Sequence, residues 1–203
     1  MRSLFLLILS VLAINAWSQS KTKSDSTANI ILTDIDISGG KGALSSGVYV
    51  YFNLESKKAY IQTTVSNSDI EITYLYRLFK DRILIGPNGG YFYNIPYGGI
   101  VLVFAPTNFI ETLHWRSWSL GEPDGEINFN NSMFLLAVNS ISFKVWNFKA
   151  SYSLIQYMEN KAQHTATLKY SQKVAPNFLI YTDVGYDFSN EMQLLKIGVN
   201  WKK

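Results

Sequence analysis

Apolar and polar side chains alternate with a period of two along most of this chain. In residues 178–188 the even positions are apolar or aromatic apart from Thr182, and the odd positions include Asp183, Gly185 and Asp187. The same alternation runs through residues 47–55, 58–65, 70–79, 143–156, 165–171 and 194–201. A helix would repeat its apolar residues three and four positions apart, so this pattern predicts β-strands.

Clusters of glycine, proline, asparagine and aspartate separate the alternating stretches. They fall at residues 38–40, 67–69, 86–90, 121–125, 176–177 and 189–191. Because these residue types favour chain reversals, each cluster predicts a turn between antiparallel neighbours. The resulting prediction is an all-β chain of about ten to twelve strands, with eight as the lower alternative. Residues 100–105 and 133–138 are apolar on both faces, which is typical of a strand covered on both sides.

The first eighteen residues differ from the rest. Arg2 precedes an apolar run from Leu4 to Ile14 that only Ser10 interrupts, and Ala16 and Ser18 supply small residues before Gln19. A basic start, a short apolar core and a small-x-small ending are typical of a secretory signal peptide. We therefore expect a signal peptide in residues 1–18, a polar and flexible leader in residues 19–28, and one β-domain in residues 29–203.

Composition limits the chemistry that this exported domain can perform. The chain has no cysteine and two histidines, so it can form no disulfide, and a structural zinc site is not expected. A formal net charge of +3 over 203 residues gives no reason to expect a nucleic-acid partner. After the signal peptide, no apolar stretch approaches the ~20 residues that a membrane helix needs. No cofactor or metal is predicted.

Strands with two distinct faces fit either a soluble barrel with an apolar interior or a membrane barrel with an apolar exterior. Three observations favour the membrane barrel. Aromatic residues such as Trp201 and Tyr186 stand near strand ends. The opposite faces are small or moderately polar, with only 16% of the residues charged, and several strands are long with connections of two to four residues at one end. The signal peptide, the alternating strands and the last strand at residues 194–201 together resemble the bacterial outer-membrane β-barrels.

This resemblance implies an antiparallel up-and-down transmembrane β-barrel in the outer membrane of a Gram-negative bacterium. It implies membrane lipid and the outer-membrane insertion machinery as partners, and leaves the oligomeric state open. One departure concerns the C-terminus, where these barrels often end on an aromatic residue. Here Lys202 and Lys203 follow Trp201, so that signal is displaced.

The alternation assigns each strand residue to one of two faces. The face that would line the lumen carries charges of both signs: Asp34, Asp36, Glu71, Arg77, Lys149, Lys169, Asp183, Asp187 and Lys196. The face that would meet lipid or form the aromatic girdles includes Trp146, Tyr152, Val184, Tyr186, Ile197, Val199 and Trp201. Opposite charges in a poorly solvated space should pair, and we expect Asp183 and Lys196 to pair across the turn at residues 189–191. Such a lumen would be plugged or narrow.

No catalytic residue is predicted. One constellation, Glu111, His114, Ser117 and Ser119, superficially suggests the Ser-His-Glu set of outer-membrane lipid A deacylases, in which serine follows histidine by two positions. Here serine follows by three, so on a strand the two side chains point to opposite faces. The glycine-rich residues 38–42 lack the spacing of a phosphate loop and are interpreted as a hairpin loop.

The sequence therefore favours a porin-like, non-catalytic outer-membrane barrel with a structural, adhesive or narrow-channel role. Two alternatives remain. One is a soluble secreted or periplasmic β-barrel that binds an apolar ligand, and the other is a barrel-embedded lipid-modifying hydrolase.

Overall fold

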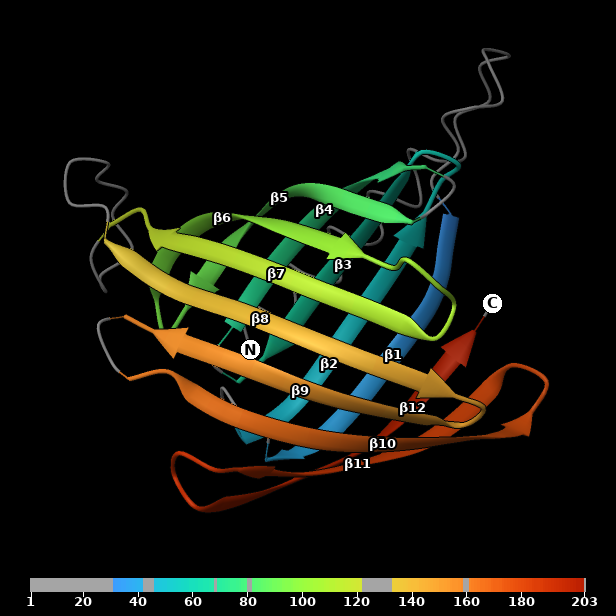
Figure 1. The fold of residues 1–203 in the computed structure, drawn as a ribbon. Helices are drawn as coiled ribbons and strands as arrows, with labels where there is room; N and C mark the ends of the chain where they lie inside the picture. The colour runs from blue at the N-terminus through green and yellow to red at the C-terminus, as the bar shows by residue number, and fades with distance from the viewer. Residues whose placement is uncertain are drawn as a thin grey trace, which may run out of the picture.

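The computed structural model describes residues 31–41, 46–67, 69–79, 82–121, 133–158 and 161–202. These residues form twelve strands, and each pairs antiparallel with its neighbours in the chain. Strand β1 also pairs with β12, so the sheet closes into a barrel, and Figure 1 shows blue β1 beside red β12. The strands are β1 (Ile31–Lys41), β2 (Ser46–Glu55), β3 (Ala59–Ser66), β4 (Asp69–Leu78), β5 (Ile83–Phe92), β6 (Ile95–Phe104), β7 (Ile110–Ser119), β8 (Phe134–Val145), β9 (Phe148–Tyr157), β10 (Gln163–Ala175), β11 (Phe178–Asp187) and β12 (Met192–Lys202).

This count is at the upper end of the predicted ten to twelve strands and rules out eight. The expected signal peptide and leader, residues 1–28, lie outside the described residues. No helix in the described ranges is long and apolar enough to cross a membrane.

The two ends of the barrel differ. At the end that we name the turn end, residues 146–147 and 176–177 join their strands tightly, and β1 begins and β12 ends there. At the opposite end, the loop end, residues 120–133 form the longest connection between consecutive strands. The predicted turns at residues 176–177 and 189–191 fall between strands, and the one at residues 67–69 overlaps the first residue of β4.

Successive side chains of each strand point alternately to the inside and to the outside of the barrel. In β11 the side chains of Ile180, Val184 and Tyr186 are exposed on the outside, whereas Tyr181 and Asp187 are buried on the inside. The outer face is thus the apolar one. A soluble barrel with an apolar interior would have the reverse arrangement.

Residues 86–90 do not form the predicted turn, because they lie inside β5. The pairing of β4 with β5 keeps one register on both sides of Pro87, from Thr73 opposite Asn88 to Tyr76 opposite Ile85. A Cβ atom on Gly90 would stand 1.9 Å from the carbonyl oxygen of Ile70, so glycine permits the close approach of the two strands. Pairing along the whole strand therefore overrides the local turn preference of these residues.

Residues 38–40, predicted as a turn, likewise belong to a strand. They lie in β1 and pair with β2 and β12. Gly40 has a φ of 141°, and a Cβ there would lie 2.0 Å from the carbonyl oxygen of Leu195. Glycine at this position allows the first and last strands to lie close together, and it does not form a turn.

Residues 143–156 form two strands rather than the single stretch that their alternation suggested. Trp146 and Asn147 make the turn between β8 and β9, with Trp146 at a φ of 51° and 90% exposed. The assignment of Trp146 to a strand face is therefore wrong. A two-residue turn changes which positions face outward, so Phe143 and Val145 share the outer face with Phe148.

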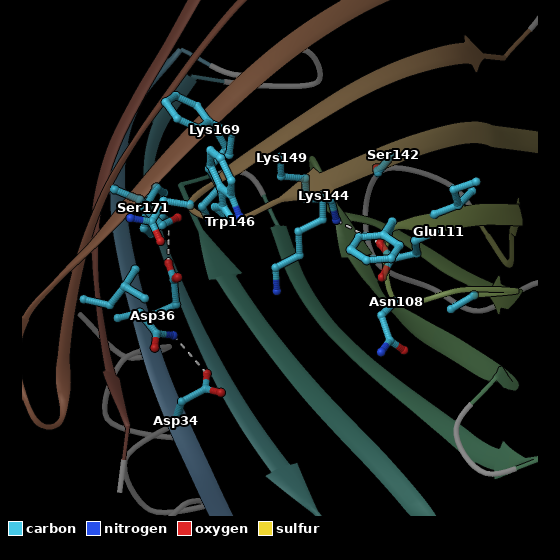
Figure 2. A pocket seen from close by; sticks show the side chains of 18 of the residues that line it. Asp34, Asp36, Asn108, Glu111, Ser142, Lys144, Trp146, Lys149, Lys169 and Ser171 are labelled. Carbon is cyan, nitrogen blue, oxygen red and sulfur yellow. Dashed lines mark hydrogen bonds and ion pairs between the residues drawn. The ribbon is translucent and has the colours of Figure 1, made fainter.

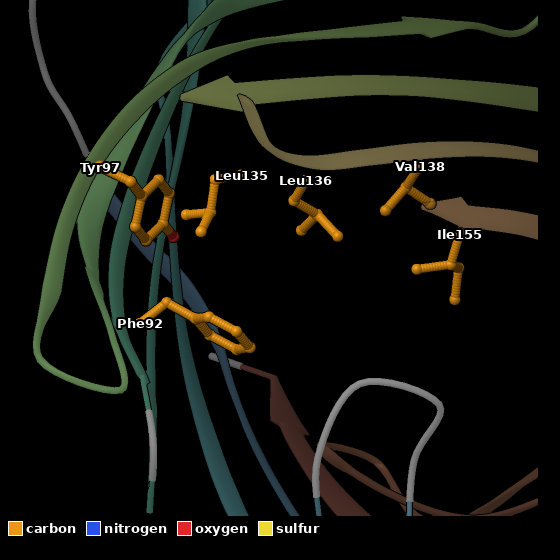
Figure 3. Packing of buried hydrophobic residues seen from close by; sticks show 6 residues of the cluster. All are labelled: Phe92, Tyr97, Leu135, Leu136, Val138 and Ile155. Atoms are coloured by element: carbon orange, nitrogen blue, oxygen red, sulfur yellow. The ribbon is translucent and has the colours of Figure 1, made fainter. Parts of the chain in front are cut away.

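Apolar side chains also fill part of the interior, near the loop end on β5, β6, β8 and β9. The cluster consists of Phe92, Tyr97, Leu135, Leu136, Val138 and Ile155 (Figure 3). Leu113, Trp115, Tyr157 and Met158 pack against it. Residues 135–138 are all buried, as the two-sided apolar pattern predicted, whereas on β6 Val101 is buried and Ile100 and Phe104 are exposed. The cluster occupies the interior at the loop end and leaves the polar interior at the turn end.

Candidate functional site in the barrel interior

A cavity of about 810 Å³ opens inside the barrel toward the turn end. Figure 2 shows side chains from strands far apart in the sequence pointing into it, among them Asp34, Lys149 and Lys169. Its cationic lining residues are Arg82, Lys144, Lys149, Lys169, Lys173 and Lys202, and its anionic ones are Asp34, Asp36 and Glu111. Six cations face three carboxylates, so the cavity has an excess of positive charge.

Three of these lysines stand directly opposite one another on consecutive strands. Lys144 on β8 pairs in register with Lys149 on β9, which pairs with Lys169 on β10. Like charges in directly opposed positions destabilise a sheet. This row therefore works against the stability of the barrel, and an anion in the cavity would relieve the repulsion.

Each of the last two lysines in the row has a partner in the wall. The Lys149 Nζ atom lies 2.9 Å from Oε1 of Glu111 on β7. The Lys169 Nζ atom lies 3.4 Å from the centroid of the Tyr181 ring, an arrangement that attracts a cation to the face of the aromatic ring. Neither contact covers the whole ammonium group, since both side chains line the cavity.

The carboxylates of β1 are held by neutral donors rather than by the lysines. Tyr181 donates its hydroxyl hydrogen to Asp36 at 2.6 Å, across the junction of β11 with β12 and β1. Asp34 accepts hydrogen bonds from the side-chain amides of Asn53 and of Asn200. These carboxylates connect β1 to β2, β11 and β12, and with Glu111 they balance three of the six positive charges in the cavity lining.

Asp183 and Lys196 are directly opposite in the register of β11 and β12, as expected. The expected ion pair between them is wrong, because no ion pair within 4.0 Å joins these two described residues. Lys196 Nζ instead lies 3.9 Å from the centroid of the Tyr49 ring. The lysine side chain is much longer than that of aspartate, so its ammonium group extends past Asp183 to the wall at β2.

The remaining predicted inner charges lie outside this cavity. Glu71 accepts hydrogen bonds from Tyr97 at 2.5 Å and from Thr73 at 2.7 Å. Arg77 pairs with Glu55 at 2.6 Å, near the turn end of β4 and β2.

Asp187 is fully buried and has a local structural role. Its carboxylate accepts hydrogen bonds from the backbone N–H groups of Ser189 and Asn190 and from the side-chain amide of Asn190. It therefore fixes the turn between β11 and β12 rather than contributing a charge to the cavity.

The predicted outer residues point away from the interior in their strands, apart from Trp146 in its turn. Val184, Tyr186, Ile197, Val199 and Tyr152 are exposed, and Trp201 is half-buried. Tyr152 and His164 contact one another on the outer wall, with the hydroxyl 2.6 Å from Nδ1.

The residues considered for catalysis are separated by the wall. His114 is exposed on the outer face, where Nδ1 lies 3.0 Å from Oδ1 of Asn139. Ser117 is fully buried on the inner face, and Glu111 pairs with Lys149. Among the described residues, no group of three or more His, Asp or Glu side chains is placed to hold a metal ion.

Sequence reasoning missed several lining residues, of which Lys144 is the most informative. Extending the alternation of β9 backward through the turn at residues 146–147 would place Lys144 on the outer face, whereas it faces the cavity. The alternation of Ile141, Phe143 and Val145 with Ser142 and Lys144 is visible in the sequence and would have shown this face. The sequence therefore contained the pattern that assigns Lys144 to the inner face, but the pattern could be used only after the turn at residues 146–147 had been located.

A closed antiparallel barrel of twelve strands with an apolar exterior and a charged interior has the architecture of the outer-membrane porins. The comparison with solved structures agrees. The NanC porin has a TM-score of 0.54 and 11% identity, over 84% of this chain and 100% of that chain.

The KdgM porin, solved in complex with disordered oligogalacturonate, has a TM-score of 0.55 and 11% identity, over 85% of this chain and 99% of that chain. At this identity the likeness establishes the fold. No family model matches the sequence, and no curated protein matches it either.

Proposed function

We propose that this protein is a non-catalytic outer-membrane β-barrel whose interior is a narrow, anion-preferring channel. The observation that carries the proposal is the contrast between the two faces. The outer face is apolar and exposed, at Ile197 and Val184 for example, whereas the cavity is lined by six cations and three carboxylates. An apolar exterior is stable only against lipid or another apolar surface, and a charged interior requires water or solute.

The fold and the expected signal peptide support the membrane location. A secretory signal and the fold shared with two porins are consistent with export and insertion into an outer membrane. In such barrels the tight turns face the periplasm and the longer loops face outward, so the cavity would open to the periplasm. The alternative of a soluble barrel with an apolar ligand needs the apolar face inside, opposite to the arrangement of β11 and β12.

The lysine row supports a preference for anions. Lys144, Lys149 and Lys169 lie opposite one another, and the cavity lining holds six cations against three carboxylates. A cavity with excess positive charge concentrates anions and repels cations. The oligogalacturonate in the KdgM structure is a polyanion, and the charge of this cavity suits a solute that carries carboxylates.

The apolar cluster at the loop end supports a narrow path. Phe92, Leu136 and Ile155 occupy the interior there, where a wide porin would hold water. We therefore expect small single-channel conductance, with the cluster as the constriction.

Planar bilayer recordings test the proposal. Under a KCl gradient, the purified protein should show small conductance and a reversal potential displaced toward that of chloride. The double variant Lys149→Gln with Lys169→Gln should reduce this displacement, because it removes two charges from the cavity wall. Lys161→Gln is the matched control, since Lys161 is exposed in the connection between β9 and β10.

Three results would contradict the proposal. Cation selectivity in the unmodified protein would contradict the role of the lysines. A large and unselective conductance would indicate a general porin. Release of the protein from membranes by a carbonate wash would indicate a soluble barrel instead.

A further inference from the structure

The outer wall carries almost no charge, with one exception on β7. Within the interiors of the described strands, Arg116 is the one charged side chain on the outer face. It pairs in register with Ile100 on β6 and Ala137 on β8, and the adjacent Ser117 is fully buried on the inner face. A permanent charge at such a position needs an explanation, because the surrounding wall is apolar.

Arg116 belongs to a small polar patch that we define as His114, Arg116 and Asn139. One Arg116 nitrogen, Nη1, donates to the carbonyl oxygens of Trp115 at 2.9 Å and Val138 at 3.4 Å. The other, Nη2, donates to Oδ1 of Asn139 at 3.1 Å, and Nδ1 of His114 lies 3.0 Å from the same oxygen.

These contacts hold the guanidinium flat on the wall without exhausting it. A guanidinium carries more N–H donors than these three acceptors use, and its charge has no carboxylate among the hydrogen-bond partners given above. The side chain is only half-buried, so its remaining donors are accessible from outside the barrel. The patch is therefore a positioned cation that lacks an anion.

The position of the patch along the barrel indicates which anion is available. Trp118, an exposed outer residue two positions further toward the loop end, is the type of side chain that marks the membrane interface. Arg116 lies roughly 7 Å along the strand from it, within reach of lipid headgroups. An outward arginine is much less costly near the interface than at the middle of the bilayer.

We propose that the patch of His114, Arg116 and Asn139 binds the phosphate of a lipid headgroup in the leaflet at the loop end. The proposal rests on the membrane location proposed above. An arginine fork matches the geometry of phosphate oxygens and forms charge-assisted hydrogen bonds with them. The side-chain amide nitrogen of Asn139 provides a further donor beside it.

A second copy of this chain is a less suitable occupant. In the part of the chain that the structure describes, the outer face of the strand interiors carries no Asp or Glu. Two barrels in contact through these walls would therefore offer Arg116 no carboxylate. Membrane lipids that carry phosphate supply an anion at the required depth without any additional interface.

Native mass spectrometry of the refolded protein in detergent micelles tests the proposal. The probes are phosphatidic acid, which carries a phosphomonoester, and diacylglycerol with the same acyl chains and no phosphate. The wild-type protein should retain phosphatidic acid in preference to diacylglycerol. Arg116→Gln should weaken the retention of phosphatidic acid about tenfold and leave that of diacylglycerol unchanged. Arg116→Lys should restore part of it, because the charge returns without the fork.

Two controls separate the patch from other causes. Lys161→Gln removes one positive charge from the exposed connection between β9 and β10, and this variant should retain phosphatidic acid as the wild type does. Gel mobility with and without boiling shows whether each variant has folded. Equal retention by folded wild type and Arg116→Gln overturns the proposal, as does a wild-type dimer that the variant cannot form. A wild-type protein that leaves membranes in a carbonate wash overturns the membrane location as well.

Discussion

Ile197 offers the sharpest test of which face of the barrel meets lipid. It is the sixth of the eleven residues of β12, and its side chain is 57% exposed on the outer wall. Its neighbours in register are Gly39 on β1 and Thr182 on β11. The substitution Ile197→Arg would place a charge at the middle of this wall, far from both ends of the strand.

The expected cost follows from that central position. An arginine on the lipid face near the bilayer midplane costs about 2–4 kcal/mol, which lowers the folding equilibrium constant about 30-fold to 900-fold. Ile197→Ala removes the apolar side chain without adding charge and should cost less. Lys196→Ala, on the adjacent inner position, loses the contact with the Tyr49 ring, which is worth about 0.5–2 kcal/mol.

Folding into lipid vesicles, followed by urea titration and by gel mobility without boiling, measures these differences. Ile197→Arg should shift the urea midpoint down strongly, and Val184→Arg should act in the same direction from the neighbouring strand. The reasoning is refuted if Ile197→Arg folds as well as the wild type while Lys196→Ala does not. The apolar face would then not be the lipid-facing one.

Three further predictions concern the wall, a turn and the N-terminus. Gly90→Val should abolish the folded band on unboiled gels, because its Cβ would lie 1.9 Å from the carbonyl oxygen of Ile70. The control Gly39→Val should fold, since the nearest atom to its Cβ is 4.0 Å away. Equal behaviour of the two variants would contradict the close approach of β4 and β5. Asp187→Ala should lower the free energy of unfolding by about 1–3 kcal/mol through the loss of the hydrogen bonds in its turn, and an unchanged urea midpoint would count against that role. N-terminal sequencing of exported protein should begin at Gln19, and a retained Met1 would contradict the signal peptide.

The residues whose secondary structure was predicted wrongly from the sequence were mispredicted for one reason. Residues 86–90 and Gly40 carry strong local turn signals, yet they lie in strands because several neighbouring strands pair with them at once. Conversely, Trp146 has little turn preference and still forms a turn, since the strands on either side of it pair with one another. Local preference is weak compared with the pairing of whole strands, and the sequence displays only the former.

Part of the candidate site could be predicted from the sequence, and the rest depended on how whole strands pair. Lys149 and Lys169 were assigned to the inner face from alternation alone, but their direct opposition to Lys144 depends on the register between three strands. The pairing of Asp183 with Lys196 was deduced correctly as a register and incorrectly as a contact. Register gives the positions of Cα atoms, whereas the length of a side chain and its other neighbours decide where its charge lies.

The sequence by itself determined the period of the strands, and with it the separation of an apolar face from a polar one, because side chains in a strand point alternately to opposite sides. It also determined that the chain has no cysteine, and it predicted an export signal in residues 1–18. Only the tertiary structure decided that twelve strands close on themselves, with β1 beside β12, and that the apolar face is the outer one. Closure joins residues from the two ends of the chain, such as Asp36 and Tyr181, and no local pattern contains contacts at that separation.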